Sequence, residues 1–251
     1  VKLTPKKEVN GIALQGVGSG TTIHHVQIHR ASDDSVEFFG GTAQMKYVLA
    51  TGCEDDIFDW TNGWTGKVQF FIGHQSGAGD HGIEADNLED NHDAAPRANP
   101  TLYNFTLVGD SSIADGSHGV ELRRGTAGTL RNFLVYGFKE QCFKVTDAAT
   151  KALMGNSLTI AGSLVDADTC FKGDTATRDW FTKESTNRTG DPGLKKVDIA
   201  GPDYTPAAGS PALSGAAARP AGDSFIEDVD FIGGMGPKDN WIAGWTAYPL
   251  N

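Results

Sequence analysis

A short acidic pattern recurs along the first part of the chain, and this repeat constrains the fold more than any other feature of the sequence. The segment "SDDSVEFFGG", which begins at Ser32, returns as "EDDIFDWTNG" from Glu54. Later copies are "DHGIEA", "SHGVEL", "EQCFKV" and "DTCFKG", the last beginning at Asp168. The apolar members align at steps of 22, 25, 37, 23 and 28 residues, and they are Val36, Phe58, Ile83, Val120, Phe143 and Phe171. Such a period indicates a repeat architecture.

Each unit also contains a second apolar or alternating run, such as "KYVLATG", "VQFFIGH" or "LRNFLVYG". Two short strands per unit, separated by Gly, Asp and Asn, suit one turn of a β-solenoid. An α/β barrel would need a helix between successive strands, and a propeller blade would need about forty residues. We therefore predict an all-β fold in which equivalent residues stack as ladders roughly 4.8 Å apart.

The repeat resembles a right-handed, single-stranded parallel β-helix of the pectin-lyase-like type over roughly residues 11–173. We expect coils over residues 1–173 and a loop-rich segment over 174–251, packed on the coils in the same domain. The anchors expected in that segment are Phe225, Phe231, Trp241 and Trp245. Its "GSPAL" stretch resembles the tail that follows the last coil in secreted bacterial β-helix proteins. The resemblance thus implies an extracellular or cell-surface protein.

The N-terminus "VKLTPKKEVN" has no apolar core of a signal peptide, so we expect any signal peptide to have been removed or to lie outside this chain. The following "GIALQG" enters the solenoid without an evident capping helix, which would leave a strand edge open for pairing. We expect additional N-terminal coils, with Val1 not the native N-terminus, or a second chain to cover that edge.

The charge balance and the cysteines narrow the classes of partner. A formal net charge of -11 disfavours nucleic acid, which needs clustered Lys and Arg, and favours cations or sugars. The sequence contains no stretch approaching eighteen apolar residues, so no membrane span is expected. If the last two repeats stack, Cys142 and Cys170 lie within disulfide range, and a disulfide would favour export. Free buried thiols are the alternative, and Cys53 has no partner in the chain.

Carboxylates occupy the position after each apolar residue, which alternation along a strand turns outward. This column reads Glu37, Asp59, Glu84, Glu121 and then Lys144. Neighbouring like charges about 5 Å apart repel by roughly 1 kcal/mol in water, so something should neutralise them. The options are Ca²⁺, a nearby arginine or a raised pKa. The candidate calcium ligands are Glu37, Asp59, Glu84, Asp86 and Glu121, and a solvated polar face is the alternative.

A second column, two residues before the apolar one, carries the catalytic hypothesis. It reads Asp34, Asp56, His81, His118 and Gln141, and Asp55 directly precedes Asp56. The order "SDD", "EDD", "DHG", "VELR" resembles the polygalacturonase family, whose motifs are Asn-Thr-Asp, Gly-Asp-Asp, Gly-His-Gly and Arg-Ile-Lys. Arg123 would take the lysine position, whereas Glu121 stands where that family has arginine, and Asn-Thr is absent before Asp34.

The resemblance implies inverting glycoside hydrolysis. Asp55 would be the general acid, Asp34 and Asp56 would hold the water, and His81 would orient them. Inversion places the two carboxyl groups roughly 6.5–9.5 Å apart. The predicted substrate contacts are Trp64 as a sugar platform, His118, Arg124 and Arg97, the last in the long insertion "DNLEDNHDAAPRANP". By alternation Trp60 belongs to the core, and the turn residues at His118 have a purely structural alternative.

Three functions therefore stay open on the sequence. The first is an extracellular protein that binds or hydrolyses a polysaccharide. The second is a noncatalytic, calcium-binding surface scaffold. The third is a polysaccharide lyase in which Ca²⁺ neutralises a uronate and Arg123 or Arg124 abstracts a proton.

Overall fold

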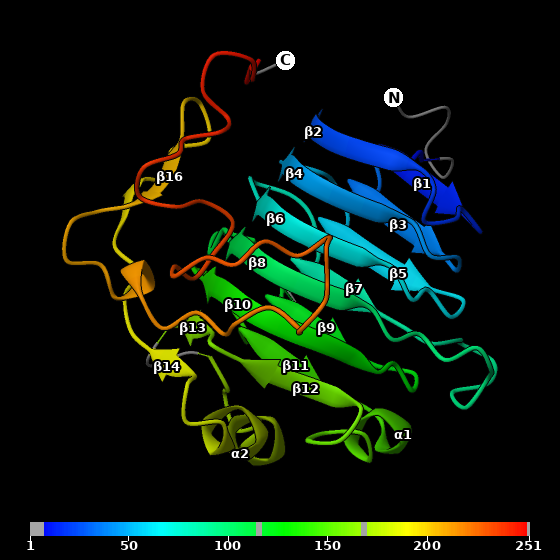
Figure 1. Cartoon of the computed structure of the whole chain (residues 1–251). Helices are drawn as coiled ribbons and strands as arrows, with labels where there is room; N and C mark the ends of the chain where they lie inside the picture. The colour runs from blue at the N-terminus through cyan, green and yellow to red at the C-terminus, as the bar shows by residue number, and fades with distance from the viewer. Residues whose placement is uncertain (1–7, 114–116, 167–169, 250–251) are drawn as a thin grey trace.

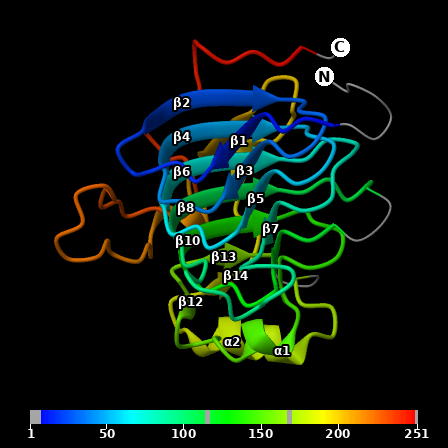
Figure 2. The same cartoon turned by 90° about the vertical axis from the view of Figure 1, so that its right-hand side faces the viewer.

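The computed structural model describes residues 8–113, 117–166 and 170–249. Its coils form a parallel β-helix, which confirms the fold class predicted from the repeat (Figure 1). The strands stack one above another along a common axis, with the first strands and the last described residues near one end and the helices at the other (Figure 2). Val1 and Asp168, on which two of the expectations depend, lie outside the described residues.

Two parallel sheets run the length of the coil. The short-strand sheet contains β1 (Ile12–Gln15), β3 (Val36–Phe39), β5 (Phe58–Thr61), β7 (Ile83–Ala85), β9 (Val120–Leu122) and β11 (Phe143–Val145). The long-strand sheet contains β2 (Thr22–His29), β4 (Gln44–Thr51), β6 (Lys67–His74), β8 (Thr101–Val108), β10 (Gly128–Tyr136), β12 (Leu158–Ala161), β13 (Leu164–Val165) and β14 (Arg188–Thr189). Since β14 lies after residue 173, the coil sheet extends into the segment that was expected to be loop-rich.

The strand register confirms the repeat alignment up to its fifth member. Val36 pairs with Phe58, and Val120 pairs with both Ile83 and Phe143. The sixth member is wrong, because Phe171 lies in a turn. The Cys142 N–H still donates to the Cys170 carbonyl at 3.1 Å, but Gly173 then adopts a φ of 84° and the chain leaves the coil.

Each of the first five long strands bends at one residue in the left-handed region of backbone space. These residues are His25, Tyr47, Phe70, Asn104 and Asn132, with φ between 54° and 61°. The pairing skips this position in every coil, so the bends are stacked. A left-handed conformation costs an L-residue roughly 1–2 kcal/mol. Stacking offsets part of that cost, since the ring centroids of His25 and Tyr47 are 4.6 Å apart and those of Tyr47 and Phe70 are 4.9 Å apart.

The core is a column of aromatic rings inside the coil. Phe71, Phe105 and Phe133 stack from one coil to the next, with ring centroids 5.0 and 4.8 Å apart. Trp60 is fully buried, as its inward position predicted. Burying such rings contributes roughly 25 cal/mol per Å² of apolar surface, so this column stabilises the coil.

Two helices lie at the end of the coil where its last strands are found (Figure 2). They are α1 (Ala148–Lys151) and α2 (Thr175–Lys183), and Asp174 caps the N-terminus of α2 by accepting the Thr177 N–H. Phe181 of α2 is buried, and its ring centroid lies 5.8 Å from that of Phe143. The helix therefore covers the apolar end of the last coil, in a segment where the sequence predicted loops.

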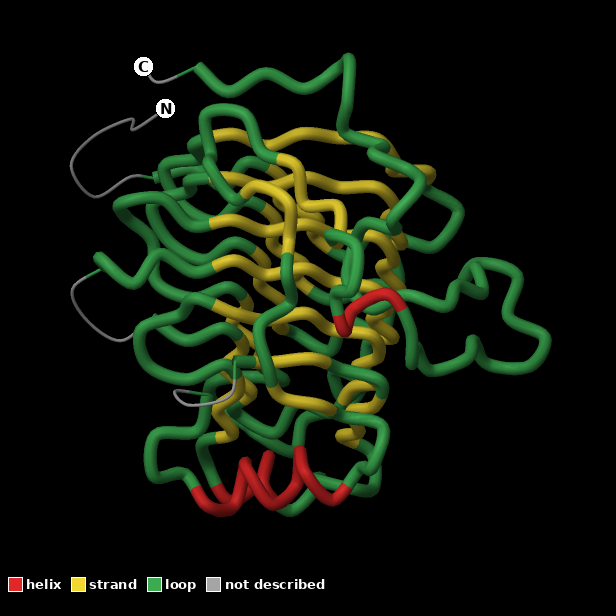
Figure 3. Tube along the Cα trace, turned by 90° about the vertical axis from the view of Figure 1, so that its left-hand side faces the viewer, coloured by secondary structure: helices red, strands yellow, loops and turns green. Residues whose placement is uncertain are grey.

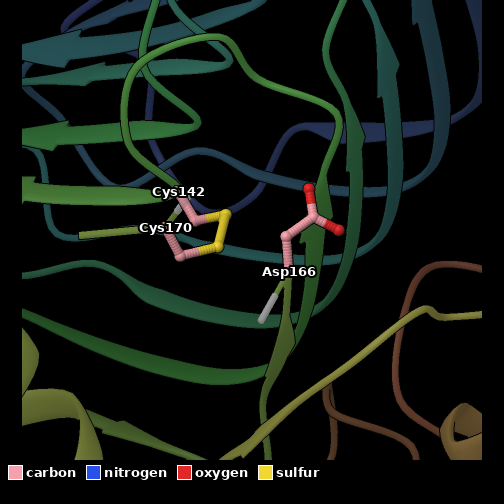
Figure 4. Close-up of side chains that lie close together, drawn as sticks. All are labelled: Cys142, Asp166 and Cys170. Carbon is pink, nitrogen blue, oxygen red and sulfur yellow. A yellow bond between two sulfur atoms is a disulfide. The ribbon is translucent and has the colours of Figure 1, made fainter. Parts of the chain in front are cut away.

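A disulfide joins the last coil to this cap. Cys142 and Cys170 are bonded, with Cα atoms 4.5 Å apart, and Asp166 lies beside them (Figure 4). The structure thus selects the disulfide over free thiols for this pair, while Cys53 is a buried free thiol. The Asp166 carboxylate accepts the Gly137 N–H at 2.7 Å, which ties the strand end to the neighbouring turn.

The C-terminal segment runs back along the outside of the long-strand sheet (Figure 3). It contains β15 (Leu194–Lys196), β16 (Asp203–Pro206) and the short helix η1 (Pro211–Leu213). Tyr204 and Trp241 are buried there against the outer face of the sheet, next to Leu49 and Ile72. Trp245 is 40% exposed; its ring centroid lies 6.2 Å from that of His25 in β2, and its indole N–H donates to the Trp241 carbonyl at 2.6 Å.

Among the described residues, no helix has both the length and the apolar character needed to cross a membrane.

Candidate functional site

The outward column of carboxylates forms the ladder that the sequence predicted. Glu37 pairs with Asp59, Asp59 with Glu84, and Glu84 with Glu121 across β3, β5, β7 and β9. Lys144 of β11 pairs with Glu121 and ends the run of acids. These side chains lie on the outer face of the short-strand sheet, because their neighbours along each strand are buried in the core.

The column from Asp34 to His118 has a structural task that the sequence did not reveal. The Asp34 carboxylate accepts the N–H of Asp56 at 3.1 Å, and the Asp56 carboxylate accepts the N–H of His81 at 2.7 Å. The His118 N–H lies 3.4 Å from the His81 ring nitrogen Nδ1. Each side chain thus binds the backbone of its equivalent one coil later and fixes the turn before the next strand.

The two columns, expected as separate ladders, meet in one row of polar groups. Three sets have ligand atoms within 4.8 Å of one another, and they are Asp34–Glu37–Asp59, Asp56–Asp59–Glu84 and His81–Glu84–Glu121. We call this row the acidic stripe, defined by Asp34, Glu37, Asp56, Asp59, His81, Glu84, Asp86, Glu121, Arg123 and Lys144. It runs along the coil axis over the outside of the short-strand sheet.

The N-terminal half of the acidic stripe favours protonated acids. Burial raises the pKa of Asp34 to about 9, with further increases from Asp56, Glu37 and Asp55. Burial also raises the pKa of Asp56 and of Asp59 well above the ordinary range. The Glu37 carboxylate accepts a hydrogen bond from Asn10, and its oxygens lie within 4.8 Å of those of Asp34 and Asp59, so a proton on one of these groups relieves their repulsion. Crowding is therefore relieved here by protons.

The C-terminal half is ionised. Burial lowers the pKa of His81, but its hydrogen bonds to Asp80 and Glu121 outweigh that effect and raise it to about 10. Burial raises the pKa of Glu121, yet its bonds to His81 and Lys144 bring it down to about 2. The His81 Nε2 to Glu121 distance is 2.6 Å, and the Lys144 Nζ to Glu121 distance is 2.9 Å.

Glu84 stands between these two halves. Burial raises its pKa to about 7, although the Arg123 guanidinium acts in the opposite direction. Glu84 thus titrates near neutral pH, with acids held protonated on one side and an ionised carboxylate on the other. Groups whose pKa values are pushed apart in this way are typical of acid–base sites.

The arginines beside the stripe are already paired. Arg123 bonds to Glu84 and, at 2.7 Å, to Asp86. These carboxylates raise the pKa of Arg123 although burial opposes them. Arg124 bonds to Asp86 at 2.6 Å and to Glu89 at 3.1 Å. Both residues lie where the sequence expected them, but as partners of protein carboxylates.

Asp55 lies at the rim of the stripe. Its carboxylate groups with those of Asp33 and Asp34, with oxygens within 4.8 Å of one another. Burial raises its pKa, and the charges of Asp33 and Asp80 add to the effect. The repeat places Asp33 and Asp80 at the same position as Asp55, but the motif did not single them out. The closest Asp34 and Asp55 oxygens are nearer than the separation typical of inverting hydrolases.

Trp64 is not a sugar platform, and that prediction is wrong. Its side chain is fully buried, and its ring stacks on Phe38 with centroids 3.9 Å apart. The turn before it uses left-handed conformations at Asn62 and Gly63, which direct the chain back into the coil. The sequence identified the turn correctly and the direction of the ring incorrectly.

The long insertion after Asp86 is held in place by its own side chains. The Asn87 amide donates to the carbonyls of His92 and Ala94 and accepts the Ala98 N–H. Arg97 donates to the His92 carbonyl at 2.9 Å and to Asp93 at 2.5 Å. The Arg97 guanidinium, which was predicted to bind substrate, therefore holds the loop in its conformation.

His118 lies under the C-terminal end of the stripe. It is 7% exposed, and its Nε2 lies 3.1 Å from Lys144 Nζ. Burial and the Lys144 charge lower its pKa to about 4, so it is neutral at physiological pH. Its neutral ring can accept a hydrogen bond from the lysine, which supports the structural alternative for this residue.

The carboxylates of the N-terminal half have a spacing that fits a calcium ion. Ca²⁺ binds oxygens at about 2.3–2.6 Å, so two ligands on opposite sides of one ion lie up to roughly 5 Å apart. The oxygens of Asp34, Glu37 and Asp59 meet this limit, as do those of Asp56, Asp59 and Glu84. An ion there would supply positive charge in place of the shared protons.

Comparison with known proteins gives one match. A family model described as a pectate-lyase-like β-helix domain matches residues 1–246. A search of curated proteins found no match, and a search of solved structures found none either.

Proposed function

Because the chain belongs to the family of pectate-lyase-like β-helix domains, we propose that its acidic stripe binds a polysaccharide and hydrolyses it by acid–base catalysis. The single observation that carries the proposal is the contact of Asp56, Asp59 and Glu84, whose oxygens lie within 4.8 Å of one another on the outer face of the coil. An extended polymer fits such a face because the stripe crosses successive coils along the axis.

The protonation states assign the roles. Burial raises the pKa of Asp59 well above its ordinary range, so we assign it as the general acid that donates a proton to the glycosidic oxygen. Glu84 titrates near pH 7 and, when ionised, attacks the sugar carbon as the glycosidic bond breaks. Water, deprotonated by Asp59, then hydrolyses the glycosyl-enzyme and releases Glu84. Arg123 keeps Glu84 partly ionised and fixes its orientation. His81 and Glu121 form an ion pair next to Glu84, on the C-terminal side of the stripe.

The charges favour a neutral or amine-bearing polysaccharide over a polyuronate. Among the described residues, each basic side chain on or beside the stripe already contacts a carboxylate of the protein. A uronate would approach this row of acids without a cation to receive it. The same pairing disfavours a lyase, since Arg123 with a raised pKa is a poor proton acceptor.

A noncatalytic, calcium-binding scaffold is the competing function, favoured by the spacing of Asp34, Glu37 and Asp59. In that case added Ca²⁺ raises the melting temperature and no polysaccharide is cleaved. An extracellular or cell-surface location fits both functions and the disulfide between Cys142 and Cys170.

The test is release of reducing ends from a panel that comprises a neutral β-glucan, xylan, chitosan and polygalacturonate, with EDTA and with Ca²⁺. We expect cleavage of a neutral or amine-bearing polymer. Asp59→Asn and Glu84→Gln should each lower kcat/KM by about 10²–10⁴-fold, as loss of a general acid or base does.

Asp90→Asn is the matched control, because Asp90 is an exposed acid on the neighbouring loop, and it should retain full activity. Circular dichroism establishes that each variant folds. If the wild-type protein cleaves none of these polymers under either condition, hydrolysis is excluded; a calcium-dependent melting temperature would then support the scaffold.

A further inference from the structure

A recess lies on a different face of the molecule from the acidic stripe. Its volume is about 460 Å³, and it lies between the first two long strands, β2 and β4, and the C-terminal segment at Ser224 and Phe225. Sites for small ligands usually have volumes of roughly 300–1,000 Å³. The stripe, by contrast, lies on the short-strand sheet, so the two sites are separate.

Four polar side chains of this recess are not used by the fold. The side chains of Thr21, Thr22, Gln44 and Ser224 line it, and none of them hydrogen-bonds to another described residue. Hydroxyl and amide groups both donate and accept, which matches the hydroxyls of a sugar. Although the chain has a formal net charge of -11, no carboxylate lines the recess. The recess therefore presents no acidic group to a ligand.

Aromatic and heterocyclic rings supply the apolar part of the wall. The Phe225 ring is half-buried, and Lys46 Nζ lies 5.0 Å from its centroid. His24 and His25 are linked through their Nδ1 atoms at 3.1 Å, and the His25 ring stacks on Tyr47. These rings do not shift easily, because Tyr47 also stacks on Phe70 and Lys46 bonds to Glu227 at 2.5 Å.

We propose that this recess is a binding site for a neutral saccharide of one or two sugar units. Rings that pack on the apolar face of a sugar and uncommitted hydroxyl and amide groups that bind its edge are the two features such a ligand needs. The site would hold a polysaccharide on the coil independently of what happens at the acidic stripe, and it requires no activity there.

Binding to the full chain can be measured by calorimetry and by saturation-transfer NMR with cellobiose, xylobiose and N,N′-diacetylchitobiose, using digalacturonate as the charged comparison. We expect saturable binding of at least one neutral disaccharide. Phe225→Ala should weaken it at least tenfold, and Thr22→Val, which removes one hydroxyl at similar size, should weaken it severalfold.

Two variants separate this site from others. Val197→Ala shortens an exposed apolar side chain of the C-terminal segment that does not line the recess, and Glu84→Gln alters the stripe; both should leave the affinity unchanged. The proposal is overturned if no neutral probe saturates, if digalacturonate is preferred, or if Val197→Ala or Glu84→Gln weakens binding as much as Phe225→Ala does. Unchanged circular dichroism of Phe225→Ala shows that a loss of binding is local.

Discussion

Asp34 has two tasks on the acidic stripe. One carboxylate oxygen accepts the N–H of Asp56 and so sets the turn before β5. The same group lies among Glu37, Asp55 and Asp56, and with its burial they raise its pKa to about 9. The aspartate is therefore required as a hydrogen-bond acceptor, while its negative charge is unfavourable in this position.

This conflict predicts how stability depends on pH. The folded-state pKa of Asp34 lies above its unfolded value, so its stabilising contribution is complete below about pH 3.8 and is lost as the pH rises through about 9. Asp34→Asn keeps an oxygen for the Asp56 N–H and removes the titration. We expect the variant to exceed the wild type in free energy of unfolding by more than about 1.4 kcal/mol at pH 8, which corresponds to a tenfold change in the equilibrium constant.

The difference should shrink toward pH 4, and urea denaturation at a series of pH values measures it. Asp90→Asn on the exposed loop should show no such dependence. A difference that stays constant from pH 4 to pH 8 would contradict the protonated state of Asp34.

At the scale of elements, the bends in the long strands give the coil its cross-section. Each bend places an L-residue in the left-handed region, and two of the five positions carry asparagine, the type that tolerates it best after glycine. Asn132 also holds the C-terminal segment, because its side chain donates to the Ala217 carbonyl and accepts the Ala217 N–H. One residue thus shapes the strand and anchors the segment outside it.

Two substitutions at Asn132 separate these contributions. Asn132→Gly keeps the backbone conformation and loses both hydrogen bonds, which should cost about 1–3 kcal/mol in free energy of unfolding. Asn132→Ala loses the same bonds and must also adopt a φ near 61°, so we expect it to be about 1–2 kcal/mol less stable than Asn132→Gly. Chemical denaturation of the two variants side by side is the measurement, and equal stabilities would show that the bend carries no backbone cost.

At the scale of the whole molecule, the C-terminal segment covers and buries part of the outer face of the long-strand sheet. Tyr204, Met235 and Trp241 cover Leu49 and Ile72, which would otherwise be exposed on the outer face of β4 and β6. The indole N–H of Trp241 donates to the Gly234 carbonyl at 2.9 Å, so the ring is buried with its polar atom satisfied. The segment is thus part of the same folding unit as the coils.

We expect Trp241→Ala to lower the free energy of unfolding by about 3–5 kcal/mol, the usual cost of removing a large buried aromatic side chain. Val197→Ala, at an exposed side chain of the same segment, should change it by less than about 0.5 kcal/mol. Limited proteolysis should cut the segment of Trp241→Ala before the coils. Equal effects of the two substitutions would show that the segment is not anchored through Trp241.

The sequence by itself determined the coil and the ladder of carboxylates. In each repeat the apolar residue and the acid after it lie on opposite faces of a strand. This alternation holds although the number of residues between repeats varies. It also placed Cys142 beside Cys170, and the structure resolved that alternative as a disulfide.

Only the tertiary structure decided how the side chains meet. The carboxylate oxygens of Asp34 and Glu37 lie within 4.8 Å of each other, and this proximity depends on backbone angles that the residue types do not specify. Trp64 points inward and Arg97 binds its own loop for the same reason. The recess at Phe225 joins segments about 180 residues apart, a long-range contact that no local pattern encodes.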